Sequence, residues 1–328
     1  MLSYKDAIRE ALYQSLALDK KVFLMGEGVY DPGGIFGTTL NLHKRFGKKR
    51  VIDLPIAENG FTGFAIGAAL AGMRPVIVHP RMDFMLVSMD QIANHAAKWS
   101  YMFGAHQPVP LTIRCIIGRG WGSAAQHSQA LEGLFMKIPG LKIVCPSNAY
   151  DAKGLLLAGI AENNPVIVVE HRWLFEGKEE VPEKVYFIPI GKAKIKRKGR
   201  DVTILAYSLM VREALDAAQI LKEGYRIDAE VIDLRALAPL DKETIINSIR
   251  RTGRAVAVTL DWKTAGVASE IMATIDEGAF RCLKAPVERV TLPDCPTPGS
   301  EALEKEFYKS KDDIVRAVLK TMRRKPIN

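Results

Sequence analysis

The segment Ile56-Ala57-Glu58-Asn59-Gly60-Phe61-Thr62-Gly63-Phe64-Ala65-Ile66-Gly67 decides how the rest of this sequence is interpreted. The apolar run at 51–54 before it has the length of a buried strand, which Pro55 ends. The apolar pattern from Phe61 to Met73 then has the length of a helix. Glu58 is therefore predicted between a strand end and a helix start, where open α/β sheets place their ligand crevices.

Small residues mark one face of the predicted helix, because Gly60, Gly63, Gly67 and Ala71 recur at spacings of three and four. Each glycine inside a helix costs about 1 kcal/mol relative to alanine, so several together indicate close packing against another backbone. The position of Glu58 alone is also compatible with a first-turn carboxylate that only complements the helix dipole.

Length and composition indicate a globular protein with two domains. The 328 residues suffice for two cores, and 48% hydrophobic with 25% charged residues excludes fibrous and disordered classes. The longest uncharged apolar run, 60–73, is shorter than the ~20 residues of a membrane helix, so no membrane partner is predicted. The acidic amphipathic start at 4–12 resembles neither a signal nor a transit peptide, and a cytoplasmic location is expected.

Cysteines and net charge suggest no special partner. The four cysteines form no C-x-x-C pair and are predicted to be small buried hydrophobic residues, at Cys115, Cys145, Cys282 and Cys295. The net charge of +9 lies largely at 192–200 and near the C-terminus, without interleaved aromatic residues. Charged side chains on the solvent-exposed edges of the protein explain this excess better than nucleic-acid binding, which is not predicted.

Strand-like and helix-like segments alternate along the chain, which predicts open parallel sheets with right-handed crossovers. Apolar strands are predicted at 22–25, 51–54, 76–78, 111–117, 141–145 and 166–169, with helices that include 83–99 and 149–161. A second α/β unit is predicted from strands at 202–207, 229–234, 255–259 and 287–290. The predicted domains are 1–185 and 201–328, joined by a connection at 186–200.

Two loops carry the remaining candidate chemistry, since no dinucleotide fingerprint, P-loop or nucleophile elbow is present. His127 follows a glycine-rich stretch and is either a surface residue or a general acid, base or hydrogen-bond donor. A second polar loop runs from His79 to Phe84 after another strand. Because strand ends of a parallel sheet meet at one rim, Glu58, Phe84 and His127 are expected to converge.

Glu58, Gly63, Phe64 and Gly67 resemble the E-x4-G-Φ-x-x-G signature of the pyrimidine-binding domain of thiamine diphosphate enzymes. Further segments resemble the β subunit of the E1 component of 2-oxo acid dehydrogenase complexes, such as those for pyruvate and branched-chain acids. These segments are 50–58, 82–84, 90–94, 124–129, 139–144, 151–155 and 231–235. The resemblance spans essentially the whole chain and implies a parallel-sheet pyrimidine-binding domain followed by a transketolase C-terminal-type α/β domain.

This resemblance implies roles for four residues. Glu58 would contact N1′ of the cofactor's aminopyrimidine, which favours the tautomer that removes the thiazolium C2 proton. Met82 and Phe84 would contact the pyrimidine. His127 would lie near the reacting carbon. The family also holds a structural K⁺ through backbone carbonyls, here around Gly159, Glu162 and Asn164.

The family further implies an α2β2 heterotetramer with an E1 α subunit. No Gly-Asp-Gly occurs in this sequence, so the α chain is expected to supply the Mg²⁺ and diphosphate site. The expected activity is lipoamide-type 2-oxo acid dehydrogenase, with acyl transfer to a lipoyl-bearing E2. Alternatives are the β chain of an acetoin dehydrogenase, a two-chain transketolase-type enzyme, or a non-catalytic regulatory partner. Arg81 and Trp121 depart from the family pattern and leave the oxo acid open.

Overall fold

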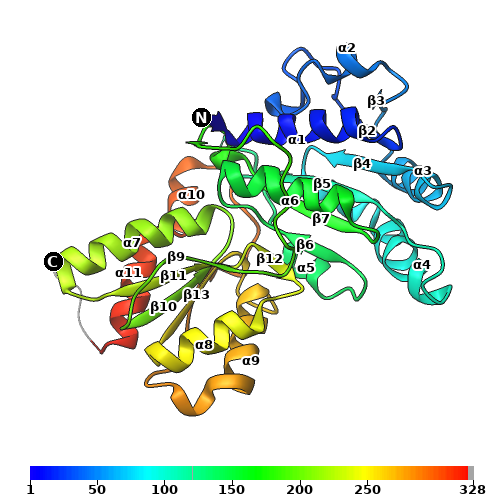
Figure 1. Cartoon of the computed structure of the whole chain (residues 1–328). Coiled ribbons are helices and arrows are strands. Elements are labelled where there is room, and N and C mark those ends of the chain that lie inside the picture. Colours follow the sequence, from blue (N-terminus) through cyan, green and yellow to red (C-terminus); the bar gives the residue numbers. More distant parts are fainter. Residues whose placement is uncertain (120, 324–328) are drawn as a thin grey trace. The chain divides into compact units, whose positions relative to one another are not determined.

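Figure 1 shows a computed structural model of the chain, in which residues 1–119 and 121–323 are described. Within these residues the first compact unit comprises 1–119 and 135–190, and the second comprises the remainder. The boundary at residue 190 falls inside the predicted connection, 186–200. The second unit also takes in 121–134, a segment for which the sequence contains no domain signal.

The first unit is built on a parallel sheet with the strand order β6-β7-β5-β4-β2-β3. Its strands are β2 (Val22–Gly26), β3 (Val51–Asp53), β4 (Arg74–His79), β5 (Thr112–Ile117), β6 (Lys142–Val144) and β7 (Val166–His171). Every residue of β2, β5 and β7 is buried, as expected for parallel strands that are covered on both faces. A short antiparallel pair, β1 (Leu2–Ser3) and β8 (Lys178–Glu179), completes this unit.

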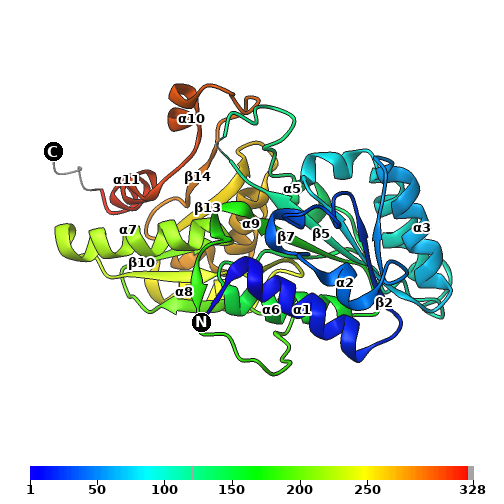
Figure 2. The ribbon, with the colours of Figure 1, turned by 90° about the horizontal axis from the view of Figure 1, so that it is seen from above.

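Helices cover both faces of this sheet. They are α1 (Tyr4–Leu18), α2 (Leu42–Phe46), α3 (Glu58–Leu70), α4 (Ala97–Met102) and α6 (Ala149–Ala161). The crossovers β6-α6-β7 and β3-α3-β4 run in opposite directions across the sheet, so right-handed connections place α6 and α3 on opposite faces. Figures 1 and 2 show α1 lying alongside α6.

The continuous helix predicted over 83–99 is wrong. The chain instead forms a 3-10 turn at Met82–Leu86, a π-helical segment at Gln91–Ala96 and then α4. The spacing of backbone hydrogen bonds changes along this stretch from three residues to five. The pattern of apolar residues does not depend on that spacing, so it could not predict the break.

The glycine face of α3 is left largely uncovered by the described residues. A Cβ atom added at Gly67 would meet nothing within 4 Å, and one at Gly60 would meet only the Ala57 side chain at 4.0 Å. At Gly63 the nearest atom would be the Gln91 side-chain oxygen, 3.3 Å away. The neighbouring Phe64 side chain is 60% exposed. The close backbone contact predicted from the glycines is therefore absent among the described residues at Gly60 and Gly67.

A buried ion pair lies in the middle of the first sheet. Arg114 on β5 and Glu170 on β7 are both completely buried. The Arg114 Nε and Nη2 atoms donate to the two carboxylate oxygens of Glu170 at 2.6 and 2.8 Å. This fork geometry neutralises both charges and fixes the relation of the two strands.

The second unit contains another sheet, in the order β14-β13-β10-β11-β9, whose edge strand β9 is antiparallel. Its strands are β9 (Lys194–Arg197), β10 (Val202–Ala206), β11 (Ala229–Asp233), β13 (Ala255–Trp262) and β14 (Glu288–Leu292); β12 (Ala236–Ala238) follows β11. Its helices are α7 (Leu209–Tyr225), α8 (Lys242–Thr252), α9 (Val267–Ala279), α10 (Glu301–Phe307) and α11 (Lys311–Thr321); the short α5 (Glu132–Met136) spans the boundary between the units.

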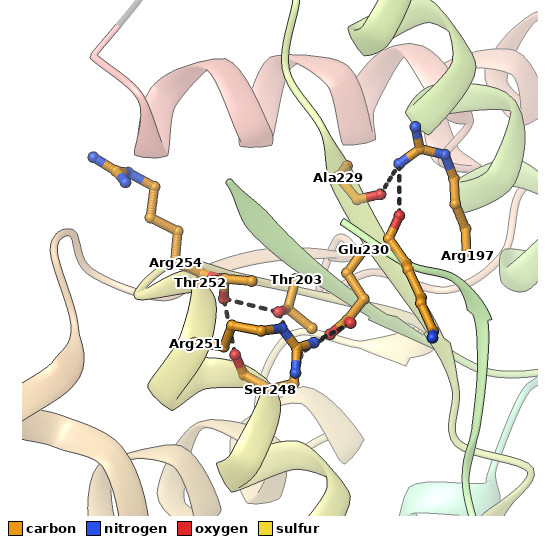
Figure 3. Close-up of polar contacts among 9 residues, drawn as sticks. Arg197, Thr203, Ala229, Glu230, Ser248, Arg251, Thr252 and Arg254 are labelled. Atoms are coloured by element: carbon orange, nitrogen blue, oxygen red, sulfur yellow. Dashed lines mark hydrogen bonds and ion pairs between the residues drawn. The ribbon is translucent and has the colours of Figure 1, made fainter. Parts of the chain in front are cut away.

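Figure 3 shows a polar network that joins β10, β11 and α8. The buried Glu230 carboxylate accepts hydrogen bonds from Ser248 and from Arg251, its ion-pair partner. The Thr203 hydroxyl lies 2.7 Å from the Ser248 hydroxyl and 2.9 Å from that of Thr252. Because the buried charge is paired and hydrogen-bonded, this network serves the fold of the second unit.

Candidate active site

Acidic side chains gather where β2 and β3 end. Gly26, the last residue of β2, pairs with Asp53, the last residue of β3. Glu27 follows directly, and burial raises the pKa of its carboxyl, with further increases from the Glu58 and Asp53 carboxylates. The three acids therefore lie close enough to repel one another.

Glu58 is the first residue of α3 and only 6% exposed. The N-terminal position of a helix stabilises negative charge, and the preceding residue, Ala57, provides no side-chain cap. Among the described residues no donor bonds the Glu58 carboxylate. A nearly buried carboxylate without a donor is costly, so the geometry suits a ligand that donates a hydrogen bond there.

The end of β4, next to β2 in the sheet, supplies the apolar part of the site. Met82 is fully buried and Phe84 is half-buried, both within the 3-10 turn that follows β4. Glu58 follows β3, whereas Met82 and Phe84 follow β4, and β2 lies between these two strands in the sheet of this unit. Their roles toward a cofactor stay predictions.

His127 belongs to the second unit. It is exposed, and its backbone N–H donates to the Ala124 carbonyl at 3.5 Å in an irregular segment. Trp121 is also exposed. The expected convergence of His127 with Glu58 stays a prediction.

The polar loop predicted from His79 onward is wrong for His79 itself. This residue ends β4, is completely buried and packs against Phe61, with ring centroids 5.2 Å apart. Neither imidazole nitrogen has a hydrogen-bond partner among the described residues. Burial lowers the pKa of His79 to about 3, so the ring is neutral at physiological pH. Burial also lowers the pKa of His171 to about 3, and the positive charge of Arg119 lowers it further.

Arginines follow β4, β5 and β7, a feature of which sequence reasoning noted only Arg81. The Arg172 guanidinium carbon lies 4.0 Å from the Phe36 ring centroid, and that of Arg81 lies 5.8 Å from the same centroid. The Arg119 guanidinium stacks on Trp173 at 4.9 Å. The separation of Arg81 and Arg172 in the sequence concealed their shared contact with Phe36, and the only usable signal was that each arginine follows an apolar strand.

The second unit contains a buried acid that sequence reasoning did not identify. Glu132 is completely buried and accepts a hydrogen bond from the Tyr207 hydroxyl at 2.6 Å. Burial, followed by the charge of the nearby Asp261, raises the pKa of Glu132.

The segment proposed for K⁺ already faces a cation. The Arg74 side chain donates to the backbone carbonyls of Ile160 and Glu162 at 3.0 and 2.6 Å, and the Glu162 carboxylate pairs with Lys142. The Gly159 carbonyl accepts from the Glu162 N–H at 3.2 Å. A guanidinium on these carbonyls competes electrostatically with a second cation. The potassium site, including Asn164, stays a prediction.

Other sites find little support in the described part of the chain. Its His, Cys, Asp and Glu side chains form no group of three that could hold a metal ion. The prediction of buried cysteines is confirmed for Cys115 and Cys145, whereas Cys282 is half-buried and Cys295 is exposed. No helix among residues 1–119 and 121–323 is long and apolar enough to cross a membrane.

The chain thus combines a parallel α/β unit, which presents at a helix start a carboxylate without a donor among the described residues, with a second α/β unit. Residues 1–177 match the family described as transketolase, pyrimidine binding domain, and residues 191–314 match transketolase, C-terminal domain. The chain belongs to this family, which confirms the predicted fold class and the resemblance of its first domain.

Relatives along the full length are β subunits. The chain is 45% identical to the acetoin:2,6-dichlorophenolindophenol oxidoreductase subunit beta of Cupriavidus necator, over 98% of both chains. It is 43% identical to the pyruvate dehydrogenase E1 component subunit beta of Rickettsia felis, over 97% of this chain and 98% of the relative. The human mitochondrial protein of that name is also 43% identical, over 98% of this chain and 90% of its own length.

A solved structure supports the fold. The split gene transketolase, described as an inactive beta4 tetramer, superposes with a TM-score of 0.79 at 22% identity, covering 99% of both chains.

Proposed function

We propose that this chain is the β subunit of a thiamine diphosphate-dependent 2-oxo acid dehydrogenase, E1, which decarboxylates a 2-oxo acid and passes the acyl group to lipoamide on E2. The observation that carries the proposal is the Glu58 carboxylate, nearly buried in the first turn of α3 and without a donor among the described residues. The relatives named as pyruvate dehydrogenase E1 β subunits support it.

The residues present suit the aminopyrimidine of the cofactor. When bound, thiamine diphosphate supplies the nucleophilic carbanion that attacks the 2-oxo group. Glu58 would hold the ring through a hydrogen bond to its carboxylate and relay a proton through it. Phe84 and Met82 would provide the apolar contact that orients the ring and excludes water. His127 would donate or accept a proton near the substrate.

A separate α chain would complete the enzyme. Diphosphate binding requires a hard cation with oxygen ligands, and this sequence lacks the Gly-Asp-Gly motif of thiamine enzymes. The α subunit would therefore hold Mg²⁺ and the diphosphate. The open glycine face of α3, with the exposed Phe64 beside it, would be a packing surface in an α2β2 heterotetramer.

A second candidate is the β subunit of an acetoin-cleaving enzyme. The 45% identity to the Cupriavidus necator protein favours it, since the two pyruvate dehydrogenase relatives above are each 43% identical. Acetoin carries no carboxylate, so substrate choice separates the two candidates.

The test is turnover of a panel of 2-oxo acids, and of acetoin, by this chain co-purified with a candidate α chain that carries Gly-Asp-Gly. Thiamine diphosphate, Mg²⁺ and an artificial electron acceptor are supplied. We expect turnover that needs both chains and falls by at least about 100-fold in Glu58→Gln, the size of a lost proton-transfer group. The control is Glu176→Gln, which changes an exposed carboxylate of the same unit.

The outcomes separate the candidates. Turnover of acetoin but of no acid would replace the first candidate by the second. Undiminished turnover by the Glu58→Gln complex would contradict both, and would favour a non-catalytic partner.

A further inference from the structure

The segment that carries His127 belongs to the second unit, although the chain on either side of it belongs to the first. Residues 121–134 group with the second unit, whereas 1–119 and 135–190 form the first. Residues 121–131 form neither a helix nor a strand, so the hydrogen bonds of regular structure do not hold them in place. His127 is exposed, whereas residues 130–133 are buried. The buried end is therefore the part that attaches this segment to the second unit.

Glu132 anchors the buried end of the segment. Its side chain is completely buried, and one carboxylate oxygen accepts a hydrogen bond from the Tyr207 hydroxyl at 2.6 Å. The same hydroxyl accepts a hydrogen bond from the backbone N–H of Leu260 at 3.2 Å. Tyr207 directly follows β10, and Leu260 lies near the end of β13, the parallel neighbour of β10. These hydrogen bonds therefore tie the segment to the carboxyl ends of two strands of the second sheet.

Gly133 lies close against the same strands. A Cβ atom at this position would lie 2.6 Å from a side-chain oxygen of Asp261 and 3.4 Å from the backbone nitrogen of Val267, the first residue of α9. That Asp261 oxygen accepts a hydrogen bond from the Val267 N–H at 2.7 Å, which fixes its position. Only a glycine therefore lets the backbone after Glu132 approach Asp261 this closely.

The chemistry of this contact favours precise placement over stability. The second carboxylate oxygen of Glu132 has no partner among the described residues. Burial and the charge of Asp261 raise the pKa of Glu132 to about 7, so a buried acid is held here at a cost that an apolar side chain would avoid. A hydrogen bond has a direction, and it fixes position and orientation in a way that apolar contacts do not. The carboxyl edge of an open α/β sheet commonly binds a ligand, and here it binds a segment of its own chain.

We propose that Glu132 and Tyr207 are positioning residues for His127. Their hydrogen bond holds the segment 121–134 on the second unit, and with it the imidazole that donates or accepts a proton under the proposed function. Both residues would act through His127 and not on the substrate themselves. This inference rests on the proposed function and deepens it, because it gives the second unit a part in the reaction.

The test is a double-mutant cycle on the complete complex with its α chain, with turnover of the best substrate of the panel as the readout. Tyr207→Phe removes only the hydroxyl and should lower kcat by about 10- to 100-fold, because a displacement of about 1 Å costs a reacting group this much. In complexes that carry His127→Ala, the same change should lower kcat by less than about twofold, since nothing is left to position. A merely structural role would lower kcat equally in both backgrounds.

Conservative variants and a matched control localise the effect. Glu132→Gln keeps an oxygen that accepts the Tyr207 hydrogen bond and should retain most of kcat, whereas Glu132→Leu should resemble Tyr207→Phe. The control is Glu230→Gln, at another buried acid of the second unit, whose hydrogen-bond donors lie on α8. This variant weakens a network of the fold, and its effect on kcat should be the same with and without His127→Ala.

Backbone hydrogen exchange of the same complexes provides a readout besides turnover. Tyr207→Phe should speed exchange within 121–134 by at least about tenfold, because the segment loses its anchor. Exchange of β11, whose position does not depend on this hydroxyl, should change by less than about twofold.

Three outcomes decide the matter. A loss of turnover in Tyr207→Phe that disappears in the His127→Ala background, together with faster exchange in 121–134, supports the inference. Glu58-dependent turnover that Tyr207→Phe leaves unchanged, or lowers equally in both backgrounds, overturns the inference and leaves the proposed function standing, as does unchanged exchange in 121–134. A complex that turns over no member of the panel overturns the proposed function, and this inference falls with it.

Discussion

Replacing His79 by leucine should remove part of the acid sensitivity of the first unit. The imidazole is completely buried, has no hydrogen-bond partner for either nitrogen among the described residues, and has a pKa lowered from 6.5 to about 3 by burial. Its charged form is therefore disfavoured only in the folded state. Leucine is similar in volume and needs no partner, so the folded state can accept it.

The sign and size of the stability change follow from the linkage between folding and proton binding. As pH falls below 6.5, the unfolded chain binds a proton at this histidine and the folded chain does not, so stability is lost as pH falls from 6.5 toward 3. The loss amounts to about 2 kcal/mol at pH 5 and only about 0.1 kcal/mol at pH 7.5. His79→Leu should therefore be more stable, relative to wild type, at pH 5 than at pH 7.5 by about 2 kcal/mol.

The assay is urea unfolding of the full chain at both pH values, analysed for the transition of the first unit. Loss of the ring contact with Phe61 costs roughly 0.5–1.5 kcal/mol at either pH, so only the difference between pH values is diagnostic. The control is His106→Leu, at an exposed histidine of the same unit, which should show no such difference. A pH-independent effect of His79→Leu would refute the assignment of His79 as a buried neutral base.

Three further predictions concern stability and assembly. Arg114→Met should destabilise the first unit by about 3–5 kcal/mol, because it leaves Glu170 charged and buried, and a double variant with Glu170→Leu should recover most of this loss in urea unfolding. Gly67→Ala should be tolerated by the isolated chain but should weaken binding to the α chain, measured by titration. Gly154→Ala should instead destabilise the chain itself, because the Cβ atom of the new alanine would lie 2.6 Å from the Tyr186 side chain. Above pH 4.5 the unfolded chain releases the Glu132 proton, whereas the folded chain keeps it because the pKa of Glu132 is raised. The stability of the second unit should therefore fall as pH rises above 4.5, and Glu132→Gln should flatten this dependence.

The sequence predicts the sheets and the place of Glu58 because these depend on local patterns. Apolar runs such as that of β5 are buried at every position, and Pro55 separates β3 from the start of α3 as expected. Other features depend on contacts across the fold. The burial of His79 could not be predicted, since a histidine at a strand end is compatible with both a core and a polar loop. The shared contact of Arg172 and Arg81 with Phe36 joins three separate segments, which no periodicity relates.

The order of the strands explains why three acids lie together at one edge of the first sheet. Carboxyl ends of parallel strands all meet at one edge, so acids and arginines mixed along it would form ion pairs and lose their capacity for a ligand. Here Glu27 directly follows β2, and Asp53 and Glu58 end and follow the neighbouring strand β3, so these three acids are grouped at one part of the edge. An arginine close to Glu27 would lower the pKa of its carboxyl, whereas burial together with Glu58 and Asp53 raises it. The charges of Glu58 and Asp53 therefore act on Glu27, and under the proposed function Glu58 keeps its capacity for a donor on the aminopyrimidine.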